Sequence, residues 1–436
     1  MTYHFVTANY KAESILLHAE FLPHPHSGER IRQKVEAALD EFDLRTRCKV
    51  LVSDQGSNIL NFANNWESAQ AVSCDAHALH NLITVDTLTK HAVTTNLIKK
   101  CKKIIKTLYW RGESLTLNVE LRKEIYRLSE DGDEELQFPL MEYENGTLVN
   151  ECPTRWTSIF AMFKSIYQNR RPIYLVLEEM GEKKQALSNA DIELLSDLIK
   201  FLQPFNDTSL VIEGDKYSTF NVAVMAREEL YIHVKSLSTN VVIRKLQGDM
   251  LEKWDTRLPH TAFHDMAYLL DPRMKDFKTV KERISIFPNL LEFVVHSTKE
   301  MRFAIPSSEL EELELNPAQA KRQKLLEVCR GKTTSKQSPL KIELAQYIHM
   351  EVSDDTNFDV LKFWDDHKAS LPILAGLARS LFAIPATSAP IERIWSRAGV
   401  LVCSRRARLT PFNVKCQLFC STNYKFIKAG RLASKK

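Results

Sequence analysis

The chain has 436 residues, too many for one simple hydrophobic core, so we expect two or three domains. Its 44% hydrophobic and 26% charged residues are ordinary for a folded protein, and no apolar run reaches the ~18 residues of a membrane-spanning helix. The net charge of +4 is too small to identify a partner by itself. The N-terminus lacks a signal-peptide pattern, and the eight cysteines have no framework spacing, so we expect reduced thiols in the cytosol or nucleus.

Strands and helices alternate in the first ninety residues. Strand segments combine β-branched and aromatic residues with rough alternation, and helix segments repeat apolar residues at helical spacing. We predict strands over 3–10 and 14–22, a helix over 28–43, a strand over 49–53, a helix over 58–66, a strand over 71–74 and a helix over 77–88.

The middle of the chain is predicted to be helical between charged connections. Residues 129–146 are acidic and punctuated by Gly and Pro, which is typical of a loop. Residues 159–297 are rich in helical periodicity, clearest over 190–205 and 221–237. Residues 306–341 change from acidic to basic, and we predict a partly disordered linker there.

A helix, a loop and a second helix are predicted over residues 384–424. Ser388 suits an N-cap, and Pro390 suits the first turn that follows it. Gly399 is predicted to end this helix, as a glycine after a helix commonly does. Thr410 is the expected N-cap of the second helix.

The charge of this end of the chain has one sign. After Glu392 there is no acidic residue, whereas the loop between the two helices carries Arg405, Arg406 and Arg408. Such a stretch can be a solubilising end or a surface that binds phosphate groups, and the residues alone leave both open.

The segment T-S-A-P-I-E-R-I-W-S-R-A-G (387–399), followed by R-A-R-L in the loop, closely resembles the C-terminal block of hAT-superfamily transposases. The matching positions are Thr387, Ser388, Ala389, Pro390, Glu392, Arg393, Ser396, Ala398 and Gly399, with Trp395 where Phe is usual. In the family this block is the dimerisation region, and its Glu is the last member of a metal-binding Asp-Asp-Glu triad. The resemblance therefore implies that Glu392 is a triad residue.

Other segments resemble the same family. V-S-D-Q-G-S-N places Asp54 at the second triad Asp, and C-D-A-H-A-L-H-N-L places Cys74 and His77 at a hallmark pair, with His80 as an extra residue. C-P-T-R-W-T-S places Arg155 and Trp156 at an element that lies near the DNA end in the family. L-D-P-R-M-K (270–275) also resembles a family segment.

The resemblance implies a mixed α/β fold with three parts. We expect the N-terminal part of an RNase H-like core over 1–158, an all-helical insertion over 159–345, and a C-terminal dimerisation region over 346–436 that completes the core. The family's first triad Asp, in a D-x-W-T-S segment, precedes the region that matches here, and no Asp occurs before Asp40. We therefore expect an N-terminally truncated core that lacks its first strand, and a family relationship to BED-finger proteins with the finger absent.

Simpler roles stay open for several of these residues. Asp54 could cap a helix after a strand, and Cys74 and His77 could be a buried thiol and a hydrogen-bonded histidine, because two ligands cannot hold zinc. The Trp156 indole could stack on an unpaired base, with Arg155 holding phosphate, or it could anchor a helix start in the core.

Dimerisation is expected through the dense apolar residues of 358–424. Part of this set should pack on the chain's own core, and the remainder should form a patch larger than monomers usually expose. The residues expected to serve dimerisation are Leu377, Leu381, Ile394, Trp395, Phe412, Leu418 and Phe419.

The function that follows is a transposase-derived nuclear protein that forms a homodimer and contacts DNA. Asp54 and Glu392 would be remnants of an incomplete triad, so we expect no catalysis, no resident metal or cofactor and no membrane partner; Mg²⁺ would bind in the family if the triad were complete. The alternative is a truncated fragment of an active, metal-dependent DNA transposase.

Overall fold

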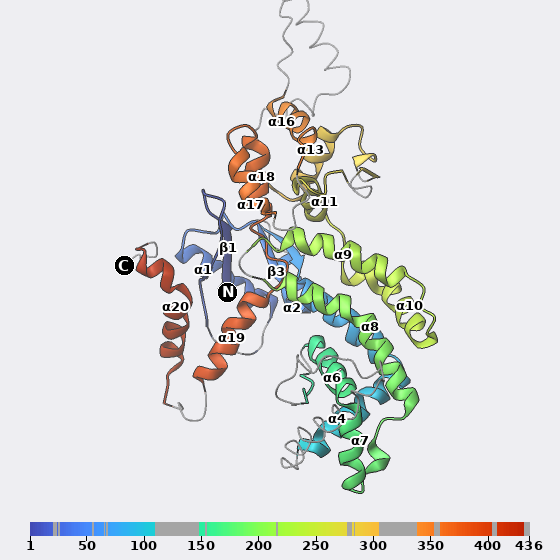
Figure 1. Cartoon of the computed structure of the whole chain (residues 1–436). Helices are drawn as coiled ribbons and strands as arrows, with labels where there is room; N and C mark the ends of the chain where they lie inside the picture. Colours follow the sequence, from blue (N-terminus) through green and yellow to red (C-terminus); the bar gives the residue numbers. More distant parts are fainter. Residues whose placement is uncertain are drawn as a thin grey trace, which may run out of the picture. The chain divides into compact units, whose positions relative to one another are not determined.

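The computed structural model describes residues 1–20, 24, 27–54, 56–64, 66, 69–109, 148–152, 155–214, 217–276, 281–282, 284–304, 338–352, 358–402 and 408–430. They divide into two compact units. Figure 1 labels most of their helices and some of their strands. The first unit comprises Met1–His77, Val211–Arg227 and Pro259–Lys436, and the second comprises Ala78–Leu210 and Glu228–Leu258. Among the described residues, no helix is long and apolar enough to cross a membrane.

The first unit contains two small sheets of two strands each. Strands β1 (Thr2–Val6) and β2 (Ala12–Leu16) are antiparallel, and β3 (Val50–Ser53) and β4 (Gln70–Ser73) are parallel. Each of the four strands overlaps its predicted range. β1, β2 and β3 are shorter than predicted, and β1, β2 and β4 begin one or two residues earlier.

The pairing of these strands corrects one expectation. If the core lacks a central strand, residues 3–10 should pair directly with residues 49–53, or another segment should fill the gap. Direct pairing does not occur among the described residues, where β1 pairs only with β2 and β3 pairs only with β4. The complete RNase H-like sheet stays a prediction.

Helices α1 (Gly28–Glu41) and α2 (Ser57–Asn64) pack closely in the first unit. Ser27 caps α1 by accepting a hydrogen bond from the Arg30 N–H. A Cβ atom on Gly28 would lie 2.8 Å from the Asn58 carbonyl oxygen, so the close approach of the two helices requires glycine there.

A helical layer forms the main core of the first unit. Its largest aromatic side chains are buried and their polar atoms are paired: the Trp364 indole N–H donates to the Leu270 carbonyl at 2.9 Å, and the Tyr347 hydroxyl donates to the Leu269 carbonyl at 2.7 Å. The helices are α11 (Ala262–Leu270), α13 (Leu290–Glu300), α16 (Pro339–Ile348), α17 (Val360–His367) and α18 (Pro372–Leu381).

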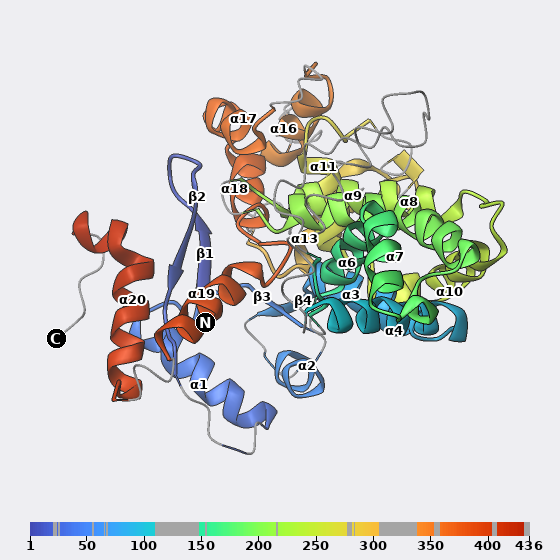
Figure 2. The same ribbon diagram turned by 60° about the horizontal axis from the view of Figure 1, so that its bottom comes forward.

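Helices α19 (Ala389–Leu401) and α20 (Pro411–Lys428) follow this layer and contact each other (Figure 2). Thr410 is the predicted N-cap of α20, and its hydroxyl accepts from the Asn413 N–H at 3.3 Å. The prediction that Gly399 ends α19 is wrong. The helix runs on to Leu401, because the backbone hydrogen bonds continue past Gly399.

Asn423 joins α20 to β2. Its side-chain oxygen accepts from the Leu16 N–H at 2.9 Å, and its side-chain nitrogen donates to the Leu16 carbonyl at 2.8 Å. The Asn423 side chain is completely buried. One amide group therefore satisfies both backbone groups of a residue at the end of β2.

The second unit is helical in its described residues. Side-chain contacts join the start of this unit to α10. Arg257 forms an ion pair with Asp86, and the Nε2 atom of His91 contacts the carboxylate of Asp249. It contains the π-helix η1 (Asn81–Leu88), α4 (Ala92–Tyr109), α6 (Trp156–Gln168), α7 (Arg170–Glu179), the 3₁₀ turn η4 (Lys183–Gln185) and α10 (Val241–Arg257), with parts of α3 (Asp75–His80), α8 (Asn189–Ile212) and α9 (Phe220–Lys235).

The two units do not coincide with the predicted three-part division. The helical insertion was predicted over 159–345, whereas the second unit comprises Ala78–Leu210 and Glu228–Leu258. The reason is that α4 packs against α6, so it belongs with the later helices. The loop predicted over 129–146 and most of the linker predicted over 306–341 lie outside the described residues.

Candidate functional site around Cys74 and His77

The site lies where β4 meets the start of α3. The Cys74 N–H donates to the Ser53 carbonyl at 2.8 Å, which extends the β3–β4 ladder by one bond. The Cys74 side chain is completely buried, and His77 lies one helical turn further along the chain. The strand and the helix start therefore place a thiol and an imidazole side by side.

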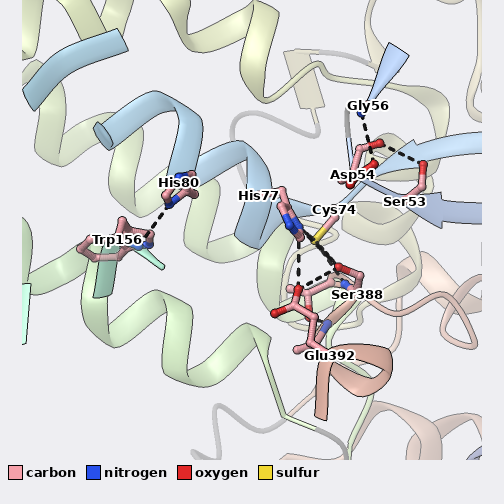
Figure 3. Close-up of polar contacts among 11 residues, drawn as sticks. Ser53, Asp54, Gly56, Cys74, His77, His80, Trp156, Ser388 and Glu392 are labelled. Atoms are coloured by element: carbon pink, nitrogen blue, oxygen red, sulfur yellow. Dashed lines mark hydrogen bonds and ion pairs between the residues drawn. The ribbon is translucent and has the colours of Figure 1, made fainter. Parts of the chain in front are cut away.

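Ser388, the residue before α19, completes the polar contacts of the thiol (Figure 3). Its backbone N–H donates to Cys74 Sγ at 3.2 Å, and its hydroxyl oxygen lies 3.3 Å from the same sulfur. His77 Nδ1 lies 3.3 Å from Cys74 Sγ and 3.4 Å from Ser388 Oγ. Ser388 occupies the predicted N-cap position, but its hydroxyl serves this cluster instead of a backbone N–H of α19.

Glu392 joins the cluster from the first turn of α19. The Ser388 hydroxyl donates to Glu392 Oε1 at 3.2 Å, and the same oxygen lies 3.9 Å from His77 Nδ1. The carboxylate and the imidazole are each about one-third exposed, so solvent weakens this ion pair.

Asp54 lies directly after β3. Its side-chain oxygen Oδ1 accepts from the Gly56 N–H at 3.2 Å, in a short turn ahead of α2. In Figure 3 the side chains of Cys74 and His77 are drawn between those of Asp54 and Glu392. Because Gly56 precedes α2, this bond closes a turn ahead of the helix and does not cap a backbone N–H of α2.

Besides the hydrogen bond to Cys74, the charges of both predicted triad carboxylates, Glu392 and Asp54, act to raise the pKa of His77. The hydrogen bond to Cys74 is the main cause that raises the pKa of the His77 imidazole above its ordinary value; burial opposes it, and the charges of Glu392 and Asp54 support it. A positively charged His77 would be a counter-ion shared by the two carboxylates. Their role as a catalytic pair stays a prediction.

An ion pair next to the site was not predicted from the sequence. Arg227 donates from Nε to Asp75 at 3.0 Å and from Nη1 to the Pro259 carbonyl at 3.1 Å, and a second bond from Nη2 also reaches Asp75. The Asp75 N–H donates to the Ala386 carbonyl at 3.0 Å. The only signal in the sequence is the acidic residue that follows Cys74, since its partner lies far along the chain.

The described residues of the site do not fit a Mg²⁺ centre. Mg²⁺ requires near-octahedral oxygen ligands, whereas a thiol and an imidazole lie beside Glu392 here. Within the described part of the chain, no group of three or more His, Cys, Asp or Glu side chains could hold a metal ion. We therefore derive no reaction step through a metal.

The predicted DNA-contacting pair lies at the start of α6 in the second unit. Trp156 is buried, its ring lies 6.5 Å from that of Phe205, and its backbone N–H donates to His80 Nδ1 at 3.1 Å. In this conformation the indole anchors the helix start, and it cannot stack on a base. Of the two roles left open for Trp156, the structure fits the anchor of a helix start and not a side chain that stacks on a base. The neighbouring Arg155 is exposed.

The predicted basic loop is described only in part. Arg405 and Arg406 lie outside the described residues, and Arg408 is exposed. Their contact with DNA stays a prediction.

The predicted dimerisation residues fall into two groups. Trp395 and Phe412 are 50% and 71% exposed, and Phe419 is partly buried. The other four are buried within the chain, so the expectation that they contact a partner directly is wrong. They are Leu377, Leu381, Ile394 and Leu418.

Comparison with known proteins identifies the region that holds Ser388 and Glu392. Residues 343–424 match the hAT family C-terminal dimerisation region. The chain is 20% identical over 392 residues to human zinc finger BED domain-containing protein 4, covering 88% of this chain and 32% of that protein. It is also 20% identical over 462 residues to tpeD of Talaromyces stipitatus, named as a transcriptional regulator, covering 97% of this chain and 52% of that protein.

The chain thus spans about a third to a half of the length of these curated relatives. The matches are consistent with a domesticated transposase of the hAT type, and the resemblance predicted from the sequence motifs is confirmed.

Proposed function

We propose that this chain is a transposase-derived nuclear protein that forms a homodimer through its C-terminal region, contacts DNA and has no transposase activity of its own. The observation that carries the proposal is an exposed apolar end of α19 and α20 within the matched dimerisation region. We define this apolar end as Trp395, Val400, Val402 and Phe412, all of them exposed.

The apolar end suits an interface between two copies. Trp395 and Val400 lie on α19, Val402 is the residue that follows this helix, and Phe412 lies in the first turn of α20. The two helices contact each other, and Ile394 and Leu418 are buried in one apolar cluster. Burying such aromatic side chains supplies much of the stability of protein interfaces, because each Trp or Phe removes on the order of 150–250 Å² from water. A stable obligate interface needs on the order of 2,000 Å² in total, so further residues of the region would take part.

Light scattering on the intact chain tests the dimer. We expect a dimer at micromolar concentration and a largely monomeric Trp395→Glu/Phe412→Glu variant. The matched control is Leu237→Glu/Ile286→Glu, which changes two even more exposed apolar residues outside the matched region and should leave the dimer intact. A monomeric intact chain, or equal effects of the two variants, would refute the proposal.

Contact with DNA is supported by charge. The chain carries no acidic residue after Glu392, and Arg397, Arg408 and Lys428 are exposed there. Basic side chains gathered at one end favour phosphate groups. The names of the relatives, a zinc finger protein and a transcriptional regulator, support DNA as partner and the nucleus as location.

The absence of catalysis is proposed from the geometry of the site. Two-metal phosphoryl transfer needs carboxylates free to clamp metal ions, whereas Glu392 is engaged by Ser388 and lies beside His77. We expect the purified chain to leave a supercoiled plasmid intact with Mg²⁺ or Mn²⁺. Nicking that is abolished by Asp54→Ala would instead show an active transposase fragment.

A further inference from the structure

We propose that one face of helix α4 binds the phosphate backbone of duplex DNA through Lys99, Lys103 and Lys106. We call this surface the lysine face. The inference rests on the proposed contact with DNA. It adds to the basic C-terminal residues a second contact surface, which lies in the second unit and outside the matched dimerisation region.

Helix α4 has one basic side and one apolar side. The helix reads A-V-T-T-N-L-I-K-K-C-K-K-I-I-K-T-L-Y, with five lysines and no acidic residue. Positions 99, 103 and 106 follow each other at spacings of four and three, so they lie on one face of a helix. The opposite side is buried in the core of the second unit, through Leu97, Ile98, Cys101, Ile104, Ile105 and Leu108.

The lysines of α4 differ in their partners. Lys100 donates to both carboxylate oxygens of Asp191, at 2.8 and 2.7 Å, and Lys102 forms an ion pair with Glu151. Lys99, Lys103 and Lys106 are exposed, and none of them forms an ion pair with a residue that the structure describes. Lys100 and Lys102 thus lie at the sides of the helix, whereas Lys99, Lys103 and Lys106 lie on the face opposite the buried side.

The positive surface extends beyond α4. The turn η4 contacts this helix, and the Thr107 hydroxyl donates to Gln185 Oε1 at 2.9 Å. Lys184, directly before Gln185, is exposed. A second element therefore adds a basic side chain near the end of the lysine face.

The dimensions of the lysine face suit a nucleic acid strand. The seven steps from residue 99 to residue 106 span ~10 Å at 1.5 Å per residue. Each strand of B-DNA advances about 3.4 Å per phosphate, so three lysines match about three successive phosphates. Lysine acts as a point charge without preference for a base, so this contact would be independent of sequence.

A membrane surface fits these observations less well. An amphipathic helix that lies on a membrane inserts an apolar face between the lipids. The apolar side of α4 is already buried in the protein, so lysines alone would meet the lipid headgroups. Duplex DNA needs no apolar face, and the charge pattern favours it.

The test measures binding of the full chain to a fluorescent 30-base-pair duplex of arbitrary sequence between 50 and 200 mM salt. The variant is Lys99→Gln/Lys103→Gln/Lys106→Gln. Each lost phosphate contact lowers the slope of log affinity against log salt by about 0.9, so we expect the slope to fall by about 2–3 and the affinity at 100 mM salt to fall at least tenfold. Circular dichroism verifies that the variant is folded.

The matched control removes the same charge from scattered sites of the same unit. Lys200→Gln/Lys235→Gln/Lys245→Gln changes three exposed lysines on α8, α9 and α10, and its slope should change by less than about 1. Equal losses in the two variants would show a general charge effect and overturn the assignment.

The remaining outcomes separate this inference from the proposed function. If the intact chain binds duplex and the lysine-face variant binds equally well, the lysine face is not the contact, while the proposed DNA contact stands. If the intact chain does not bind duplex at all, the proposed DNA contact itself is wrong, and the inference falls with it. If the variant loses binding only to vesicles that contain phosphatidylserine, the surface meets membranes and the inference is wrong.

Discussion

The backbone N–H of Ser388 donates to the sulfur of Cys74 at 3.2 Å, although 314 residues separate the two in the sequence. The bond connects the residue after β4 to the residue before α19, and both are parts of the first unit. The N–H groups at the start of a helix have no partner within that helix. The Cys74 sulfur is therefore an acceptor for the segment that leads into α19.

Removing this acceptor should destabilise the first unit. We expect Cys74→Ala to cost about 1–3 kcal/mol, because the Ser388 N–H loses its partner in a partly buried site. Cys74→Ser should cost less, because a hydroxyl still accepts. For a unit of this size, each kcal/mol lowers the melting temperature by about 2–4 °C. Calorimetry checks the order of the two variants, with the exposed Cys420→Ala as an unaffected control. Equal losses for Ala and Ser would contradict this account.

The protonation of His77 should respond to its neighbours in a definite order. The hydrogen bond to Cys74 is the largest cause of the raised pKa, ahead of the charges of Glu392 and Asp54. We therefore expect Cys74→Ala to lower the pKa of His77 most, followed by Glu392→Gln and then Asp54→Asn. Titration of labelled histidines by NMR measures this order. An unchanged His77 pKa in Glu392→Gln would show that the 3.9 Å pair does not form in solution.

The raised pKa of His77 predicts how the stability of the protein depends on pH. Because folding raises the pKa of His77, its contribution to stability is fully present below the ordinary value of 6.5 and is lost as the pH rises through the folded-state pKa. Urea unfolding between pH 5 and 8 should therefore show a smaller fall in stability for His77→Gln than for the natural chain. A parallel pH dependence in the two proteins would exclude His77 as a source of it.

Breaking the pair between Arg227 and Asp75 should be costly. Both side chains are largely buried, so either Arg227→Met or Asp75→Asn leaves a polar or charged group without its partner, at a cost of about 3–5 kcal/mol. The double variant should cost less than the sum of the single ones, because it leaves no uncompensated charge. A double-mutant cycle in urea measures this coupling. Additive losses would mean that the two residues act independently.

Local patterns in the sequence located most helices and strands but not their long-range partners. The alternation of residues 3–10 and 14–22 predicted two strands, and Thr410 was identified as an N-cap because capping depends on neighbouring residues. Which strands pair depends on contacts across the chain. Of the two alternatives expected for the first strand, direct pairing with residues 49–53 does not occur among the described residues. Gly399 was misjudged because a glycine can also lie within a helix.

The long-range contacts within the site around Cys74 and His77 were not predicted from the sequence either. Family motifs brought Cys74, His77 and Glu392 to notice, but no periodicity places Ser388 between them. Trp156 had two roles open in the sequence, and only its burial against Phe205 decides between them.

Asn423 should hold α20 against β2, and its loss should expose the end of that strand. Its side chain is completely buried and satisfies both the N–H and the carbonyl of Leu16. Asn423→Leu keeps a similar volume but leaves both backbone groups without a partner, which should cost about 2–4 kcal/mol. Hydrogen exchange should show faster exchange of the Leu16 amide in this variant. The exposed Asn413→Leu serves as the control on the same helix. If the Leu16 amide stays as protected in Asn423→Leu as in the natural chain, the side-chain bridge does not hold the strand, and α20 is fixed by its apolar contacts alone.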